Sequence, residues 1–482
     1  MTSHHISNHP APYHKARIQL NKNTLITGLL RKKPIDSEPQ RDTGLNRTLS
    51  AWDLTLLGIG AIIGAGVFVL SGIAAATQAG PAVALSFVVA GTACAFTALA
   101  YAELAAAIGG AGSAYGYAYA GFGELIAWII GWDLILEYSL AVAVVAIGWS
   151  GYVNNALTSM GLELPATLLR GPAEGGIVDL PAAGIILVLA GMLMLGVRES
   201  ARFNAVIVFI KLLAIAVFIG VAAFHVDTAN WHPFMPFGWS GVMGGAALVF
   251  FAYIGFDAVS TAAEETRNPQ RDMPIGILTS LSFCTIIYII VGLLLTGIAP
   301  YASLNVASPV AFALSQAGAR WAAAVVSAGA IAGLTTVMLV MFYGQTRILF
   351  AMSRDRLLPP IFSHLNAKTR TPIRAIAVCG LTIALIAGFA PISAVAELVN
   401  IGTLAAFVLV SAGVIALRHQ QPDLKRPFRE PFSPVIPVLG ILFCLYLIFS
   451  LQYITWLGFA IWTALGLIVY FAFSRRHSAL AS

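Results

Sequence analysis

Four ionisable side chains stand inside long apolar runs of the sequence, where a charge is costly to keep. They are Asp133, Glu137, Lys211 and Asp257. A charged group away from water needs a partner, a cavity or a proton that it can gain or lose. These residues are therefore the first candidates for chemistry. For Asp133 the simpler interpretation is polar packing inside the protein, whereas for Glu137 packing and function are evenly balanced.

A glycine-rich stretch in the first apolar run indicates a site of a different kind, made of backbone. Residues 58–68 read GIGAIIGAGVF, with Gly64, Ala65 and Gly66 near the middle of the run. The spacing is not that of a dinucleotide-binding loop, and no soluble strand precedes it. Such glycines serve close helix packing, or they mark a helix that unwinds in the membrane. An unwound helix would direct N–H groups at a carboxylate and carbonyls at an ammonium group.

A second run of the same kind lies five apolar segments later. Gly244 and Gly245 precede the stretch 250–257, so that glycine and a charge again fall inside one segment. A pair of glycine-interrupted segments, at equivalent places in two sets of five, is the sequence pointer to an inverted-repeat transporter with a midplane site. The pattern alone predicts a small zwitterionic or charged solute.

The elements that must position these groups are about twelve apolar helices. The chain has 482 residues, of which 59% are hydrophobic and 10% are charged, against roughly 25% charged residues in soluble domains. Because about 20 apolar residues span a bilayer as a helix, an all-α integral membrane protein is expected and a water-soluble globule is excluded. The segments lie at roughly 51–76, 82–107, 121–152, 180–197, 203–224, 241–264, 275–298, 320–353, 372–390, 394–418, 434–452 and 455–474. The third and eighth are long enough to tilt strongly or to project into water.

The basic residues predict the orientation of the chain. If both termini are cytoplasmic, all of the 27 Lys and Arg side chains except Arg170, Arg320 and Lys211 lie on the cytoplasmic side. This asymmetry follows the positive-inside rule, so a multi-pass protein of the cell membrane is expected. Residues 1–47 are expected to form a disordered cytoplasmic tail, and 477–482 a short cytoplasmic tail at the other end.

Other classes of function have little support in the sequence. The cysteines all lie in apolar runs and are interpreted as packing residues, so neither a disulfide framework nor a metal site is predicted. The apolar segments contain no histidine, which argues against a membrane-embedded enzyme, and no cofactor is expected. The basic residues behind the net charge of +6 are distributed as membrane topology requires, and the sequence contains no nucleic-acid-binding motif, so a nucleic-acid-binding protein is not indicated. A channel and a membrane amino acid sensor stay as remote alternatives.

Three stretches resemble a known family. Residues 60–68 are similar to the first-helix motif of the amino acid/polyamine/organocation (APC) transporters. Phe250–Thr261 with the following 264–274, and the stretch 343–359, are similar to the cationic amino acid transporter branch. The similarity runs from about Thr48 to Arg476.

The resemblance implies a LeuT-like fold and amino acid transport by alternating access. The transporter domain would cover residues 48–476. It would hold an inverted repeat of five helices (about 51–224) and five helices (about 241–418), followed by two further helices (about 434–474).

The resemblance also implies which residues meet the substrate. First-helix backbone amides would bind the carboxylate, and carbonyls of the first and sixth helices would bind the amino group. The amides belong to Ile63, Gly64, Ala65 and Gly66, and the carbonyls to Ile62, Phe251, Ala252 and Ile254. Met341 would face the substrate side chain, while Glu137 and Asp257 match acidic positions near the site.

Lys211 matches a fifth-helix lysine that, in sodium-independent relatives, stands where sodium-coupled members hold a sodium ion. This implies a proton as the coupling ion, with Lys211 as its carrier. The alternative is a snorkelling lysine, because Lys211 lies only about eight residues, or roughly 12 Å, from the end of its segment. Two positions depart from the family pattern: Ala65 replaces a common Ser or Thr, and Arg356 replaces a small residue in a cytoplasmic loop.

The resulting hypothesis is a secondary active transporter for proton-coupled uptake (symport) of an L-amino acid. Met341 occupies space that an arginine or lysine substrate would need, which favours neutral amino acids. Glu137 and Asp257 would favour cationic ones if both were ionised and faced the cavity. The main alternative is therefore a sodium-independent exchanger of cationic amino acids. The sequence leaves open whether a small membrane subunit accompanies the chain.

Overall fold

The computed structural model describes residues 31–32, 48–108, 113–196, 201–366, 368–369 and 371–480. Within these ranges the fold is helical, and extended pairing is limited to the isolated bridges Leu49–Thr266 and Leu169–Asp179. Apart from residues 31–32, the expected N-terminal tail lies outside the described residues.

Helical structure occupies each of the twelve expected apolar segments. The longer helices are α4 (Val83–Ile108), α6 (Glu124–Ser159), α8 (Ala201–Ala222), α10 (Pro269–Ile298), α12 (Arg320–Arg354) and α14 (Ile392–Gln420). The shorter ones are α2 (Ala51–Ile62), α7 (Leu180–Met194), α9 (Gly238–Val249), α13 (Ile373–Phe389), α15 (Val435–Phe449) and α16 (Tyr453–Val469). Seven helical stretches in the described part of the chain are long and apolar enough to cross a membrane.

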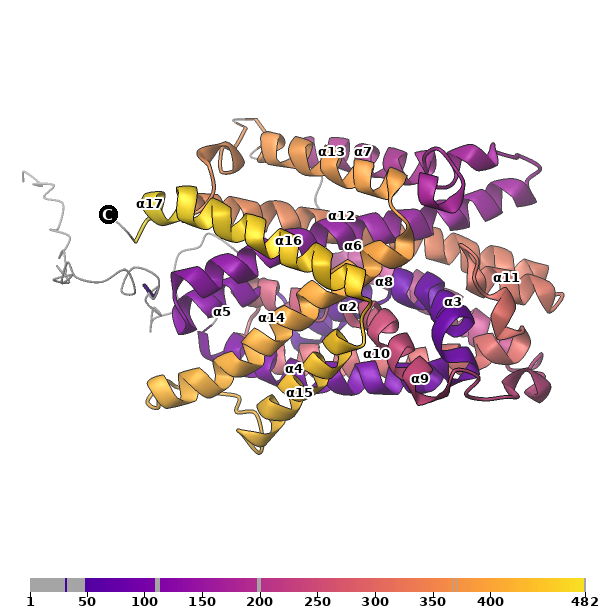
Figure 1. Cartoon of the computed structure of the whole chain (residues 1–482), viewed down its shortest axis with the longest axis horizontal. Helices are drawn as coiled ribbons and strands as arrows, with labels where there is room; N and C mark the ends of the chain where they lie inside the picture. The colour runs from indigo at the N-terminus through magenta and orange to yellow at the C-terminus, as the bar shows by residue number, and fades with distance from the viewer. Residues whose placement is uncertain are drawn as a thin grey trace, which may run out of the picture.

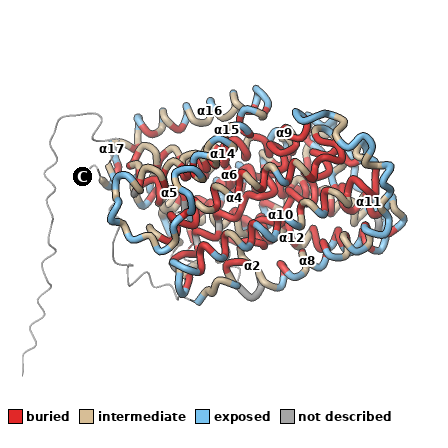
Figure 2. The backbone as a smooth tube through the Cα atoms, turned by 90° about the horizontal axis from the view of Figure 1, so that it is seen from below, coloured by how far each residue is buried: buried red, intermediate tan, exposed pale blue. Residues whose placement is uncertain are grey.

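The helices form an elongated bundle with the longest ones inside (Figure 1). α6 packs against α12 and α14, and α4 packs against α10. α6 has 36 residues and is therefore about 54 Å long, which agrees with the expectation of an overlong third segment. Buried backbone runs along the interior of the bundle (Figure 2), whereas α7, α13 and α16 turn large apolar side chains outward. Apolar side chains on an outer surface are what a lipid environment favours.

Two helices are broken near the centre of the bundle, where the glycine pattern predicts breaks. α2 ends at Ile62, Ile63 is extended (φ −74°, ψ 98°), and helix resumes as a π-helical turn at Gly66–Leu70. In the sixth segment α9 passes into a 3₁₀ turn that is followed by Ile254 (φ −60°, ψ 132°) and then by Gly255. Gly255 has φ +118°, a conformation that side chains other than glycine rarely adopt.

The two breaks are in direct backbone contact with each other. A Cβ atom on Gly66 would stand 2.2 Å from the Cα atom of Ala252, and one on Gly255 would stand 2.9 Å from the backbone of Ala61. Both distances are shorter than van der Waals contact, so only glycine fits at either position. The breaks therefore support each other as one unit.

An ionic cluster joins α4 to α14 at the end of the bundle where α12 and α14 finish, called the basic end below. The buried Glu103 of α4 accepts a hydrogen bond from Arg418 Nε of α14 at 2.9 Å and from the backbone N–H of Glu430 at 2.7 Å. Arg426 Nε lies 3.5 Å from the same carboxylate. The Glu430 carboxylate is buried nearby, and within the described chain neither of its oxygens has a hydrogen-bond partner. Burial, helped by the Glu103 charge, raises the pKa of Glu430 to about 8.

We expect Glu430→Gln to stabilise the protein at alkaline pH. An ionised Glu430 is disfavoured in the folded state, so between the ordinary pKa of 4.5 and about 8 the folded protein loses stability as pH rises. Glutamine cannot ionise, and the gain at pH 8.5 should be about 1–3 kcal/mol, the usual cost of an unsatisfied buried group. Thermal unfolding in detergent at pH 5 and 8.5 measures it, with the exposed Glu163→Gln as control. Parallel pH curves for wild type and Glu430→Gln would contradict the expectation.

Candidate substrate site

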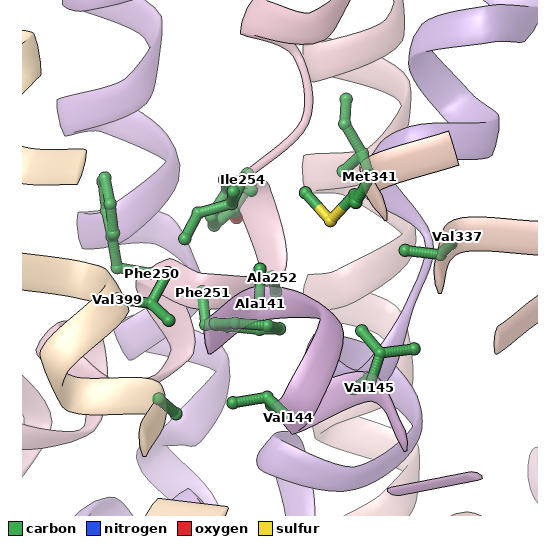
Figure 3. Packing of buried hydrophobic residues seen from close by; sticks show 14 of the residues in the cluster. Ala141, Val144, Val145, Phe250, Phe251, Ala252, Ile254, Val337, Met341 and Val399 are labelled. Carbon is green, nitrogen blue, oxygen red and sulfur yellow. The ribbon is translucent and has the colours of Figure 1, made fainter. Parts of the chain in front are cut away.

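A small cavity lies where the two broken helices meet. Its lining comes from four helical segments and is entirely apolar: Ala61, Ile62, Gly64, Ala65, Gly66, Val145, Phe251, Ile254, Val337 and Met341. Figure 3 shows Val145, Phe251, Ile254, Val337 and Met341 around the same space. The cavity volume is about 10 Å³, room for a single water molecule. An amino acid can enter only if these segments move apart.

The polar groups available at this cavity are therefore those of the backbone. A helix that starts at Gly66 leaves its first N–H groups without partners inside the helix, at the positive end of the helix dipole. The end of α2 likewise leaves carbonyls without partners inside the helix, at the negative end of its dipole. One break thus offers donors for an anion and acceptors for a cation, a few ångströms apart.

Most of the predicted site residues line this cavity. They are Ile62, Gly64, Ala65, Gly66, Phe251, Ile254 and Met341. Ile63 and Ala252 lie beside it, and their carbonyls accept hydrogen bonds from Lys211 and Tyr288.

The two predicted acidic residues lie outside the cavity lining. Glu137 is buried on α6, eight residues before Val145, and is therefore about 12 Å further along the helix axis. Asp257 is buried too, and its Oδ1 accepts the N–H of Gly255 at 3.2 Å, which stabilises the turn of the second break. Asp133 packs against α14, where a Cβ atom on Gly402 would stand 2.5 Å from its Oδ1. That oxygen has no hydrogen-bond partner in the described structure, so the carboxyl is packed against α14 with one oxygen unsatisfied.

Lys211 of α8 reaches the first break but is not part of the described cavity lining. Its ammonium donates to the carbonyl of Gly60 at 2.7 Å and to that of Ile63 at 3.1 Å. The side chain is only 1% exposed, and Gly333 of α12 leaves room for its methylene groups. Snorkelling would instead bring the ammonium to the surface of the bundle. Lys211 therefore places a positive charge at the negative end of α2.

Tyr288 of α10 is a residue that the sequence analysis missed. Its hydroxyl lies 2.8 Å from the carbonyl of Ile62 and 3.0 Å from that of Ala252, so it bridges the two breaks. A hydroxyl has one proton and can donate to one of these carbonyls at a time. The only signal in the sequence was a hydroxyl group in the middle of an apolar segment.

Comparison with known proteins relates the chain to transporters. The model of the amino acid permease family matches residues 49–473. A methylthioribose transporter of Bacillus subtilis (strain 168) is 50% identical over 94% of this chain and 100% of its own length. The branched-chain amino acid permease BcaP of the same organism is 51% identical over 94% of this chain and 99% of its own length. The vacuolar cationic amino acid transporter 4 of Arabidopsis thaliana is 38% identical over 83% of this chain and 68% of its own length.

These matches agree with the resemblance seen in residues 60–68 and 343–359, and the relatives carry the names of transporters and permeases. The chain therefore belongs to the amino acid permease family, in the cationic amino acid transporter branch of the APC superfamily.

Proposed function

We propose that this protein takes up neutral L-amino acids with aliphatic side chains by proton-coupled alternating access. The observation that carries the proposal is the apolar cavity at the crossing of two broken helices. A substrate carboxylate fits the N–H groups at Gly66, and its ammonium group fits the carbonyls near Ile62 and Phe251. The substrate side chain would then contact Val337 and Met341.

The lining supports a neutral substrate over a cationic one. A lysine or arginine side chain would leave water there without gaining a carboxylate partner from the described lining. Glu137 and Asp257 remain part of the proposal as buried groups near the site, acting on it through the helices that they belong to. The relatives named for branched-chain amino acids and for methylthioribose share about half of their residues with this chain. Exchange of cationic amino acids is the second candidate, favoured by the relatives of the cationic branch.

The contacts of Lys211 support proton coupling. Its ammonium group holds two carbonyls at the end of α2, and charge-assisted hydrogen bonds are roughly twice as strong as neutral ones. Loss of the proton would weaken both bonds and release α2 at the break. Proton exchange at Lys211 and movement of the first broken helix would thus be one event.

The proposal includes the arrangement in the membrane. Twelve helices would span it as two inverted sets of five and a final pair, with the basic end and both termini in the cytoplasm. Arg354, Arg418 and Arg476 at that end agree with the positive-inside rule. The cell membrane is the expected location.

Thermal stabilisation of the purified protein tests the substrate class. A ligand that binds only the folded state stabilises it, by about 2.7 kcal/mol at one hundred times its Kd. Wild type should respond to leucine more than to arginine. Met341→Ser should weaken the leucine response and gain an arginine response, while the volume-conserving Met341→Leu should resemble wild type. A stronger arginine response in wild type would favour the cationic exchanger, and a response to methylthioribose alone would refute amino acid transport.

Uptake into proteoliposomes tests the coupling. An inward proton gradient should drive accumulation of labelled leucine in sodium-free buffer. Lys211→Met keeps most of the volume of the side chain but cannot carry a proton, so it should lose accumulation at least tenfold. Because it also leaves two buried carbonyls without their donor, it should unfold at a lower temperature than wild type while still responding to leucine. Wild-type uptake that requires sodium and ignores pH would overturn the coupling. Sodium-free exchange without proton dependence would favour the antiporter.

Glycine substitutions test the location of the site. The Cβ position of Gly64 is 3.7 Å from the nearest atoms, those of Val337, so Gly64→Ala should fold and bind. Gly64→Leu should lose the leucine response, because its side chain needs the space that a substrate would take and is far larger than the closed cavity. Gly66→Ala should fail to fold stably, since its Cβ would overlap Ala252. Ala65→Ser should be tolerated, with one added hydrogen bond worth about 0.5–1.5 kcal/mol. Leucine binding retained in Gly64→Leu would place the site elsewhere.

A further inference from the structure

A larger cavity opens at the basic end of the molecule, far from the substrate site. Its volume is about 360 Å³. It lies between the loop that follows α12 and the short helix α17 (Arg475–His477), which continues from α16 at the end where the C-terminus is marked in Figure 1. The side chains that matter for its chemistry are Ser353, Arg356, Phe473, Arg476 and His477.

Two hydrogen bonds fasten the two sides of this cavity together, and a third closes the loop on one side. Ser474 Oγ donates to the carbonyl of Leu357 at 2.6 Å, and the backbone N–H of Ala479 donates to the carbonyl of Asp355 at 3.2 Å. Ser353 Oγ donates to the carbonyl of Pro359 at 2.8 Å and closes the loop itself. Hydrogen bonds between the loop after α12 and the C-terminal segment thus fix the shape of the cavity.

The cavity is positively charged. Two guanidinium groups line it, and no carboxylate belongs to its described lining. Glu124 accepts hydrogen bonds from the hydroxyls of Tyr119, Tyr470 and the cavity-lining Ser478, and Asp355 accepts one from Tyr115 at 2.8 Å. Within the part of the chain that the structure describes, the lining itself thus carries Arg356 and Arg476 without a carboxylate, which suits an anion from outside the chain.

His477 and Arg356 are held in defined conformations at this cavity. The His477 ring stacks on Phe473 with 4.3 Å between ring centroids, and its Nδ1 donates to the Phe473 carbonyl at 2.9 Å. Arg356 has φ +59°, a left-handed conformation that suits glycine better than arginine. Backbone strain of this kind persists where the surrounding structure imposes it, and it is common at functional sites.

We propose that this cavity binds the phosphate of an anionic phospholipid. Arginine forks match the oxygens of a phosphate group with paired hydrogen bonds, and basic pockets among membrane helices suit anionic headgroups. A lipid fits better than a soluble phosphate because the helix that carries Arg476 and His477 continues from an apolar, outward-facing one. Leu465, Ile468 and Phe471 are exposed along α16 and the turn after it, where acyl chains can lie.

Native mass spectrometry in neutral detergent tests this assignment, with phosphatidylglycerol and phosphatidylcholine offered together. Wild type should retain phosphatidylglycerol preferentially. Arg356→Gly and Arg476→Gln should each lower its retention roughly fivefold, and the double variant more. Arg354→Gln and Arg475→Gln remove neighbouring charges that do not line the cavity, so they should retain lipid as wild type does. Arg356→Gly also relieves the backbone strain, so its unfolding temperature should be unchanged or higher, which separates lipid loss from misfolding.

Two results would overturn the proposal. The first is that wild type retains both lipids equally, or that the double variant retains as much phosphatidylglycerol as wild type does. The second comes from inorganic phosphate, added without lipid. If millimolar phosphate raises the unfolding temperature of wild type but not of Arg476→Gln, and phosphatidylglycerol has no such effect, the cavity binds a soluble phosphate and the lipid assignment is wrong.

Discussion

The need to satisfy backbone polar groups at two helix breaks governs the centre of this protein. Within a bilayer every N–H and carbonyl must find a partner in the protein, because water is absent. At the first break the carbonyls of Gly60 and Ile63 are taken by Lys211, and that of Ile62 by Tyr288. The break can therefore exist in apolar surroundings, and the cavity beside it gains polar groups without any charged side chain in its lining.

The same contacts make the two broken helices one mechanical element. Gly66 lies against Ala252, and Gly255 lies against Ala61. The Tyr288 hydroxyl contacts a carbonyl of each break. A movement at one break must displace the other, because no side chain lies between the two backbones to absorb it. Lys211 reaches the first break from α8 and is not part of the described cavity lining, so the charge that holds α2 is separate from the residues that would contact a substrate.

The sequence predicts helix positions and breaks well, because both depend on local composition. Apolar length locates each segment, and Gly64 and Gly66 locate the first break. In the second run Gly244 and Gly245 lie inside α9, and the break falls further on, in the stretch 250–257. What the sequence could not supply is the direction in which a side chain points once helices pack. Glu137 and Asp257 stand in the expected segments, yet Val145 and Val337 line the cavity instead. Tyr288 was missed for the same reason, since its importance comes from two carbonyls that lie far away along the chain.

The Tyr288 hydroxyl has a consequence for the half of a transport cycle in which the carrier travels empty. A site that binds an ammonium group would leave backbone carbonyls without a donor whenever the substrate has left. The conformational change of the empty carrier would then be slow. The phenolic proton can serve the Ile62 carbonyl or the Ala252 carbonyl in turn. In the proposed transport cycle it would stand in for the departed cation, so the vacant site would stay partly solvated by the protein itself and the return step would meet a lower barrier.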